Sequence, residues 1–319
     1  MSQGILRVGL GLSLAVLLCS GAMAQNLVEN WSFETPDAAS VPGPGYFQNQ
    51  DASVTGWTLT PAGIGHGLNN NIGGSYDDGQ RNPFHGGGRP IPHGDQVLFI
   101  QGDGNGILSQ EISGMVDGNA YMLIFHSGIR PGNAGMDLWV TLGGVEMLER
   151  TTMLGAGTAP YVRYAIPFIY EESEMGANPA LEFHREWPAG GDVTILFDAI
   201  EIRPPQLAVD VTGPGLVAQG DTVVFNTALT ENVGETSYQW YYNGVELDGE
   251  TGATLELLDV VIDDSGVYSV DVTDASGSAN AAFTLIVVEA LPLSTAWVLA
   301  LLVVLMLGSG AWVLRSRQA

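Results

Sequence analysis

The arrangement of apolar residues between positions 25 and 288 constrains the fold more than any other feature. Short runs in which apolar and polar residues alternate, such as Asp137–Thr141, are separated by clusters of Gly, Pro, Asn and Asp, and helical periodicity is hard to find. A period of two residues is typical of half-buried strands, and such clusters are typical of turns. We therefore predict that this part of the chain is all-β.

The N-terminus has the three parts of a secretory signal peptide. Arg7 precedes the apolar stretch Val8–Cys19, and the small-residue sequence Ala22–Ala24 follows. The apolar stretch is too short to cross a bilayer as a stable helix, and the small residues suit a signal peptidase. We predict that residues 1–24 form a signal peptide, that the mature chain begins at Gln25 and that the protein is exported.

The C-terminal end predicts a membrane helix. The run Leu291–Leu314 contains no charged residue, and Arg315 and Arg317 follow it directly. About 20 apolar residues of helix suffice to cross the hydrocarbon core, and cations after the run favour a cytoplasmic end. A buried core helix is the alternative, but it would normally show polar residues at helical spacing. Residues 291–319 are therefore expected to form a single-pass membrane anchor or a sorting tail.

The composition excludes several chemistries. The chain has 35 acidic residues and 10 basic residues, a formal net charge of -25, and every basic residue is arginine. Without lysine there is no Schiff base and no P-loop lysine. The single cysteine, Cys19, lies in the predicted signal peptide, so the mature chain has no disulfide and no thiol nucleophile. So acidic a protein is repelled by phosphate backbones, and nucleic acid is not an expected partner.

A proline pair marks a boundary between two domains. Roughly 265 residues remain between the two hydrophobic ends, which is enough for two domains. At Arg203–Gln206 two prolines stop one strand pattern just before another begins. We predict a first domain over residues 25–203, a second over 206–288, and the tail over 291–319.

The second domain resembles the immunoglobulin-like family. Trp240 lies in an aromatic strand pattern, and the segment Asp264–Tyr268 has the form Asp-x-Gly-x-Tyr. In the family, such a tryptophan is a core residue and such a tyrosine forms the tyrosine corner. The segment departs from the family pattern because both cysteines are missing, with Val270 at the position of the second. The resemblance implies an immunoglobulin-like β-sandwich in which apolar packing around Trp240 replaces the disulfide.

The first domain looks like the galactose-binding-like jelly rolls found among carbohydrate-binding modules. The resemblance rests on short motifs that occur in order along the domain: Asn26–Glu34, Gly56–Thr58, His93–Gln101, Leu108–Ile112, Tyr121–Phe125, Leu138–Gly144 and Val193–Ile202. It implies a jelly-roll β-sandwich and a carbohydrate ligand.

That resemblance also implies a structural calcium ion. The glutamate after the opening motif and the aspartate of the closing strand correspond to Glu34 and Asp198. Ca²⁺ prefers several hard oxygen ligands, and two carboxylates from opposite ends of the domain could join its first strand to its last. The alternative is that both are surface strand residues that hold no ion. The acidic segment Asp103–Gly106 is too short for an EF-hand loop and is expected to be a hairpin turn.

Strand alternation suggests a ligand-binding face. In the run Asp137–Thr141, Leu138 and Val140 should enter the core, which leaves Trp139 on the other face. His184 alternates with apolar neighbours in the same way, so both side chains could share a solvent-facing sheet where an aromatic ring contacts a sugar. Arg130 is a further candidate. The alternative for Trp139 is a packing role.

Catalytic motifs are not evident. No serine lies in Gly-x-Ser-x-Gly, and the five histidines lack the spacing of a helical zinc motif. Scattered carboxylates could still form a glycosidase pair in space. Whether the protein is an enzyme therefore stays open, and a non-catalytic role is favoured.

The tail resembles the C-terminal sorting signals of exported Gram-negative proteins. The sequence Leu291–Ser294, the apolar run and the basic end follow their three-part layout, although the motif differs from the Pro-Glu-Pro and Ile-Pro-Thr-Leu versions. Cleavage of the tail and retention as an anchor both remain open. The sequence thus predicts a bacterial binding or adhesion protein of the cell envelope or cell surface. It would recognise a glycan or extracellular polysaccharide through the first domain, with the second domain as a spacer. An exported carbohydrate-active enzyme and a purely structural surface protein are the alternatives.

Overall fold

The computed structural model describes residues 25–35, 37, 46–48, 54–60, 65–70, 91–102, 105–130, 135–153, 161–187 and 193–289. The predicted signal peptide and the predicted C-terminal tail lie outside these ranges. Within them, no helix has the length and apolar character that a membrane crossing needs. The described chain consists mainly of strands and contains a single-turn α-helix, α1 (Glu172–Met175), and a short 3-10 helix, η2 (Ile262–Asp264). The all-β prediction is confirmed.

The chain divides into two compact units. Among the described residues, the first contains most of the chain up to Pro204, and the second contains residues 205–289 together with the short segments Gly118–Tyr121 and Pro167–Tyr170. Pro204 and Pro205 have no backbone N–H to donate to a sheet, so they separate the last strand of the first unit from the first strand of the second.

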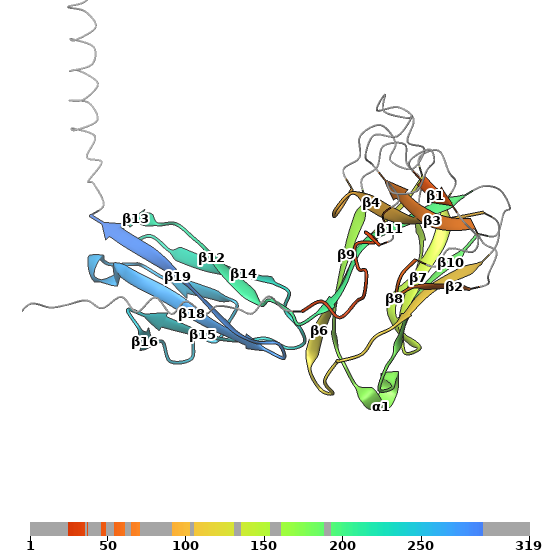
Figure 1. Ribbon diagram of the computed structural model, residues 1–319. Coiled ribbons are helices and arrows are strands. Elements are labelled where there is room, and N and C mark those ends of the chain that lie inside the picture. The colour runs from red at the N-terminus through yellow and green to blue at the C-terminus, as the bar shows by residue number, and fades with distance from the viewer. Residues whose placement is uncertain are drawn as a thin grey trace, which may run out of the picture. The chain divides into compact units, whose positions relative to one another are not determined.

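The first unit contains two sheets (Figure 1). One has six strands in the order β1 (Tyr46–Gln48), β3 (Gly65–Asn70), β4 (Gln96–Gln101), β11 (Thr194–Arg203), β6 (Ala120–Ile129) and β9 (Val162–Ile169). The other has five antiparallel strands in the order β2 (Thr58–Thr60), β5 (Gly106–Glu111), β10 (Ala180–Glu186), β7 (Met136–Leu142) and β8 (Val145–Met153).

The hairpin predicted at Asp103–Gly106 is wrong. β4 ends at Gln101 in the six-stranded sheet, and β5 begins at Gly106 in the five-stranded sheet. The chain therefore passes from one sheet to the other at this point. A turn-rich tetrapeptide between two strands predicts a change of direction, but it does not fix whether the second strand pairs with the first.

Aromatic side chains from both sheets form the core of the first unit. Phe183 of β10 lies 5.0 Å from Phe125 of β6 and 5.2 Å from Phe197 of β11, measured between ring centroids. Trp57 is buried and lies 6.1 Å from Phe183. Because the two sheets are joined by these contacts, the outer face of the five-stranded sheet is left for polar side chains.

The second unit also contains two sheets (Figure 1). One has three strands in the order β12 (Ala208–Thr212), β14 (Val223–Thr230) and β17 (Thr254–Leu257). The other has five strands in the order β13 (Leu216–Ala218), β19 (Gly277–Val288), β18 (Gly266–Asp274), β15 (Ser237–Tyr242) and β16 (Val245–Glu246), and its β13 and β19 run parallel.

The core of the second unit is built around Trp240, which is fully buried. Phe225 of β14 lies 6.2 Å from Trp240 and 5.1 Å from Tyr268 between ring centroids, so it joins the two sheets without a disulfide. The Trp240 Nε1 donates a hydrogen bond to the Gly252 carbonyl at 2.9 Å. The Tyr268 hydroxyl donates one to the Asp264 carbonyl at 3.0 Å. These contacts satisfy the polar atoms of two large buried rings.

Candidate functional site

The outer face of the five-stranded sheet carries a compact group of polar and aromatic side chains. Along β7 the residues alternate between buried and partly exposed, with Leu138 and Val140 fully buried and Trp139 on the opposite face. β10 alternates in the same way and places His184 directly opposite Trp139 in the antiparallel pair. Residues opposite one another in such a pair lie close enough for their side chains to touch.

Trp139 stands between two neighbours on this face. Its ring is stacked with that of His184, with centroids 4.9 Å apart and planes 6° from parallel. The guanidinium carbon of Arg150, on β8, lies 5.0 Å from the centre of the Trp139 ring. Because β7 lies between β10 and β8, the two neighbours cover opposite faces of the indole. The ring thus presents its edge outward, and a sugar could lie flat on it only by displacing one neighbour.

Arg150 is held in place by two carboxylates. Its Nε donates to Asp137 at 2.8 Å, and its Nη1 lies 2.6 Å from a carboxylate oxygen of Glu186. Hydrogen bonds from Thr152 and from Arg150 lower the pKa of Asp137. The hydrogen bonds that Arg150 donates to Glu186 and Asp137 raise the pKa of Arg150. A planar guanidinium that is fixed in this way can remain over an aromatic ring.

A second group of polar side chains, Thr141 and Glu182, lies beyond Trp139 along the strands, on the side away from Asp137 and Glu186. The Thr141 hydroxyl donates to Glu182 at 3.1 Å and lies 3.2 Å from Nε2 of His184. The same His184 nitrogen lies 3.3 Å from the Glu182 carboxylate. Ser109 of β5 is the register partner of Glu182 and extends the row of hydroxyl and carboxylate groups. The face therefore offers many oxygen acceptors around an aromatic centre, a composition that suits a ligand rich in hydroxyl groups.

The structure brings together two of the three residues predicted to bind a ligand. Trp139 and His184 are in contact, whereas Arg130 lies just after β6 in the other sheet, where its backbone N–H donates to the Thr194 carbonyl at 3.0 Å. Sequence reasoning missed Arg150 and Glu186. The turn at Gly143–Gly144 predicts that β8 folds back on β7, but the pairing shifts register between Leu138 and Thr141, so alternation alone could not place Arg150 beside Trp139.

The N-terminal segment of the first unit runs along β11 and brings Glu34 toward Asp198. The Asn26 side chain donates to the Ile200 carbonyl at 3.3 Å and accepts the Ile202 N–H at 3.0 Å. The Ile200 N–H in turn donates to the Trp31 carbonyl at 2.8 Å. The two carboxylates, which come from opposite ends of the domain, are thereby placed in one region.

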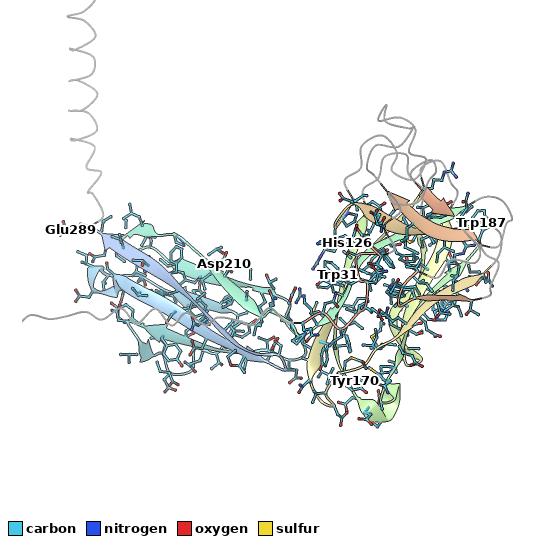
Figure 2. The ribbon with its side chains drawn as sticks, in the orientation of Figure 1. Trp31, His126, Tyr170, Trp187, Asp210 and Glu289 are labelled. Carbon is cyan, nitrogen blue, oxygen red and sulfur yellow. The ribbon has the colours of Figure 1, made fainter. Side chains whose placement is uncertain are left out.

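Each of these carboxylates is held by backbone N–H groups. Glu34 accepts hydrogen bonds from Asp95 at 3.0 Å and Gln96 at 3.3 Å. Asp198 accepts from His93 at 2.8 Å and from Ala199 at 2.7 Å. The ring of His93 also contacts the ring of Trp31, with the two centroids 4.3 Å apart. Trp31 is labelled in Figure 2.

Burial sets the electrostatics of the pair. Asp198 has no exposed surface. Burial raises its pKa to about 8, and the neighbouring Glu34 carboxylate adds to the rise, against two backbone hydrogen bonds that lower it. Burial also raises the pKa of Glu34. Two neighbouring acidic groups that are costly to ionise together become easy to ionise when a cation lies between them.

The backbone around the two carboxylates has an unusual conformation. Phe33, directly before Glu34, has φ 58°, and Ala199, directly after Asp198, has φ 50°. Gly94 has φ 65°, and a methyl group at its Cα would overlap the Glu34 carboxylate. Left-handed conformations in non-glycine residues cost energy and cluster at binding sites. The two carboxylates supply oxygen atoms of the kind that Ca²⁺ prefers as ligands, although no group of three or more His, Cys, Asp or Glu suited to a metal occurs among the described residues.

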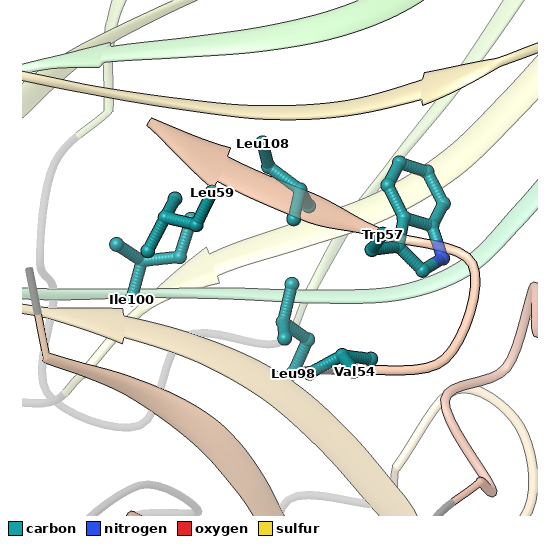
Figure 3. A pocket seen from close by; sticks show the side chains of 6 residues that line it. All are labelled: Val54, Trp57, Leu59, Leu98, Ile100 and Leu108. Carbon is teal, nitrogen blue, oxygen red and sulfur yellow. The ribbon is translucent and has the colours of Figure 1, made fainter. Parts of the chain in front are cut away.

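A small cavity lies in the core of the first unit (Figure 3). It has a volume of about 10 Å³ and is lined by Val54, Trp57, Leu59, Leu98, Ile100 and Leu108. A volume of this size is at the limit for one water molecule. The cavity is too small for a sugar, so the outer face of the sheet is the stronger candidate for a ligand site.

No protein-family model matches the chain, and no curated protein matches it. Among solved structures, TmCBM61 in complex with beta-1,4-galactotriose is similar at 17% identity and a TM-score of 0.35, covering 56% of this chain and 98% of that one. The CBM22-1 xylan-binding domain from Paenibacillus barcinonensis Xyn10C has 14% identity and a TM-score of 0.32, covering 50% and 91%. A family 16 carbohydrate-binding module has 13% identity and a TM-score of 0.33, covering 56% and 99%. All three TM-scores lie below 0.5.

Proposed function

We propose that the protein is an exported, non-catalytic binding protein that recognises carbohydrate through the outer face of its five-stranded sheet. The observation that carries the proposal is the row formed by His184, Trp139 and Arg150, which crosses three strands with its members in contact. Such a row is preorganised, so ligand binding loses little side-chain freedom. The row combines an aromatic ring with neighbouring hydroxyl and carboxylate groups, which suits a sugar that has both apolar C–H patches and hydroxyl groups.

The role of Trp139 in this proposal differs from that of an open platform. With both ring faces covered, Trp139 contributes its edge and fixes the spacing of its two neighbours. Glu182 and Asp137 lie on either side of the row along the strands and can accept hydrogen bonds from sugar hydroxyls. Carboxylate acceptors make short, strong hydrogen bonds with such donors. Arg130 is a more distant candidate that could contact a longer chain.

The test uses the full mature chain in detergent, titrated against a panel of soluble polysaccharides. Trp139→Ala is expected to weaken binding at least about tenfold, as the loss of a central contact residue does. The matched control is Tyr241→Ala, which removes a partly exposed aromatic ring from a strand of the second unit. Equal loss of binding in both variants, or normal binding by folded Trp139→Ala, contradicts the proposal. Release of reducing sugar by the wild-type protein would favour a carbohydrate-active enzyme instead.

Calcium at Glu34 and Asp198 is part of the proposal. The ion would compensate the buried charge of Asp198 and join the N-terminal segment to β11, and it would supply rigidity without taking part in any reaction. The buried carboxylate of Asp198, the neighbouring Glu34 and the left-handed backbone on either side support this assignment.

The second unit is proposed to be an immunoglobulin-like spacer. The core position of Trp240 and the hydrogen bond of Tyr268 to the Asp264 carbonyl support that identification. The first unit is proposed to be a jelly roll. Export through residues 1–24 and anchoring or sorting through residues 291–319 complete the arrangement, in which the spacer holds the sugar-binding unit away from the membrane.

A further inference from the structure

An exposed apolar surface surrounds the point where the described chain ends. On the outer face of β19, the residues change from polar or small to apolar toward the C-terminus. Asn280 and Thr284 are exposed on this face, and Ile286 and Val288, which follow at the same two-residue spacing, are 51% and 43% exposed. Leu216 of β13 is the register partner of Ile286 and is 64% exposed. Strand alternation normally places polar side chains on a solvent-facing surface, so this end of the strand needs a separate explanation.

A neighbouring loop contributes further apolar side chains. Leu258, Val261 and Ile262 are 69%, 45% and 44% exposed. Backbone hydrogen bonds join this loop to the same end of the unit: the Gly220 N–H donates to the Val260 carbonyl, and the adjacent Gln219 N–H donates to the Val288 carbonyl, both at 2.8 Å. Six exposed apolar residues thus gather around the end of β19, and we call them the terminal patch: Leu216, Leu258, Val261, Ile262, Ile286 and Val288.

The sequence limits what can cover the terminal patch. Only Glu289 and Ala290 separate Val288 from the uncharged run Leu291–Leu314. Figure 2 labels Glu289 at the end of the described chain. Three residues of extended chain span roughly 10 Å. If Leu291 lies at the edge of the hydrocarbon core, Val288 must lie within or next to the headgroup layer, which is roughly 5 to 8 Å thick on each side.

We propose that the terminal patch contacts the lipid bilayer and seats the second unit on the membrane surface. The inference rests on the proposed anchoring of the tail and adds to it a second, peripheral contact. Six exposed apolar side chains gain free energy when they enter the boundary between headgroups and acyl chains. A unit that is attached to the membrane at two places cannot rotate freely about Glu289 and Ala290. The terminal patch would therefore fix the orientation of the second unit relative to the membrane surface.

Charge favours one kind of lipid surface. From Pro204 to Leu314 the sequence contains no Arg, Lys or His. The acidic residues near the patch include Asp221 and Asp264, whose carboxylates accept backbone hydrogen bonds from Ala218 and Val261. Attraction to anionic lipids is therefore absent, and the contact is expected on zwitterionic lipid and weaker where anionic lipid is abundant.

The experiment uses the absence of cysteine from the mature chain. Three single variants of the full mature protein, Leu216→Cys, Ile286→Cys and Asn280→Cys, are each labelled with the fluorophore NBD. Each labelled protein is inserted, one chain per disc, into phosphatidylcholine nanodiscs that contain nitroxide-labelled lipid. Asn280 is the matched control because it lies on the same face of the same strand, six residues and roughly 20 Å from Ile286. A label at Ala300→Cys reports whether the tail is inserted.

We expect lipid nitroxide to quench the labels at positions 216 and 286 several-fold more than the label at 280, with the difference reduced in phosphatidylglycerol. If position 300 is quenched but positions 216 and 286 are not, the anchoring stands and the membrane contact is overturned. A blue shift of the NBD emission at positions 216 and 286 without lipid quenching would show that protein covers the terminal patch. This result would also overturn the proposed membrane contact. If position 300 is not quenched, anchoring fails and the seating fails with it.

Discussion

The buried carboxylate of Asp198 predicts that the stability of the first unit depends on pH, and that a bound calcium ion would remove this dependence. An aspartate in an unfolded chain has a pKa near 4, whereas burial raises that of Asp198 to about 8. Because the folded-state value is the higher one, the folded protein without a cation is most stable below about pH 4 and loses stability as the pH rises toward 8. At about 1.4 kcal/mol per pKa unit, ionisation of Asp198 costs on the order of 5 kcal/mol at the upper end.

A bound calcium ion removes this cost, because it favours the ionised carboxylate. Calcium binding should release up to one proton, so its affinity should rise up to about tenfold per pH unit between about pH 4 and 8. At a calcium concentration 100 times the dissociation constant, the ion stabilises the folded state by about 2.7 kcal/mol. For a unit of this size, that free energy corresponds to a rise in melting temperature of about 5 to 10 °C.

The assay is thermal unfolding of the mature protein at pH 5, 6, 7 and 8, with calcium or with a chelator. The difference between the two curves should grow with pH. Asp198→Asn keeps the size of the side chain but cannot ionise, so the variant should lose both the calcium response and the pH dependence, while Asp210→Asn, in the second unit, should keep both. Melting curves of the wild-type protein that do not respond to calcium or chelator at any pH would refute the site.

Three further predictions concern other parts of the chain. Arg150→Ala should weaken polysaccharide binding in an equilibrium titration without lowering the melting temperature much, because the Arg150 side chain is 48% exposed and ion pairs near the surface add little stability. Unchanged binding would show that Arg150 does not contact the ligand. Phe225→Ala should cost the second unit about 3 to 5 kcal/mol in denaturant unfolding, since it leaves a cavity beside Trp240, whereas a cost below about 1 kcal/mol would show that the sheets are joined elsewhere. Deletion of residues 291–319 should move the protein from the membrane fraction to the soluble fraction, and unchanged fractionation contradicts anchoring.

Alternation predicted the parts of the fold that depend on a single strand. The all-β class and the outward position of Trp139 both follow from a period of two residues. These features need only one side of a strand to be apolar. They do not depend on which strands are neighbours.

Features that depend on pairing could not be predicted in the same way. The assignment of β4 and β5 to different sheets, and the contact of Arg150 with Trp139 across a register shift, are decided by residues far apart in the sequence. The burial of Asp198 is a similar case. In sequence it is a polar residue that interrupts an apolar strand, and only the pairing of β11 with strands on both sides, together with the N-terminal segment, removes it from water.

The acidity of the chain has a structural use beyond solubility. Residues 205–288 contain no basic residue and no cysteine, and carboxylates hold their turns through backbone hydrogen bonds: Asp221 and Asp264 each accept a backbone N–H, and Asp274 accepts those of Val233 and Ser276. Although burial opposes it, these hydrogen bonds hold the pKa of Asp274 below its usual value. Its contribution to stability is therefore present above about pH 4 and is lost as the pH falls through the lower, folded-state pKa. The pKa of Asp198 is shifted in the opposite direction, upward. Acid is therefore expected to weaken the turns of the second unit, whereas in the first unit it protonates the buried carboxylate and removes the cost of its charge.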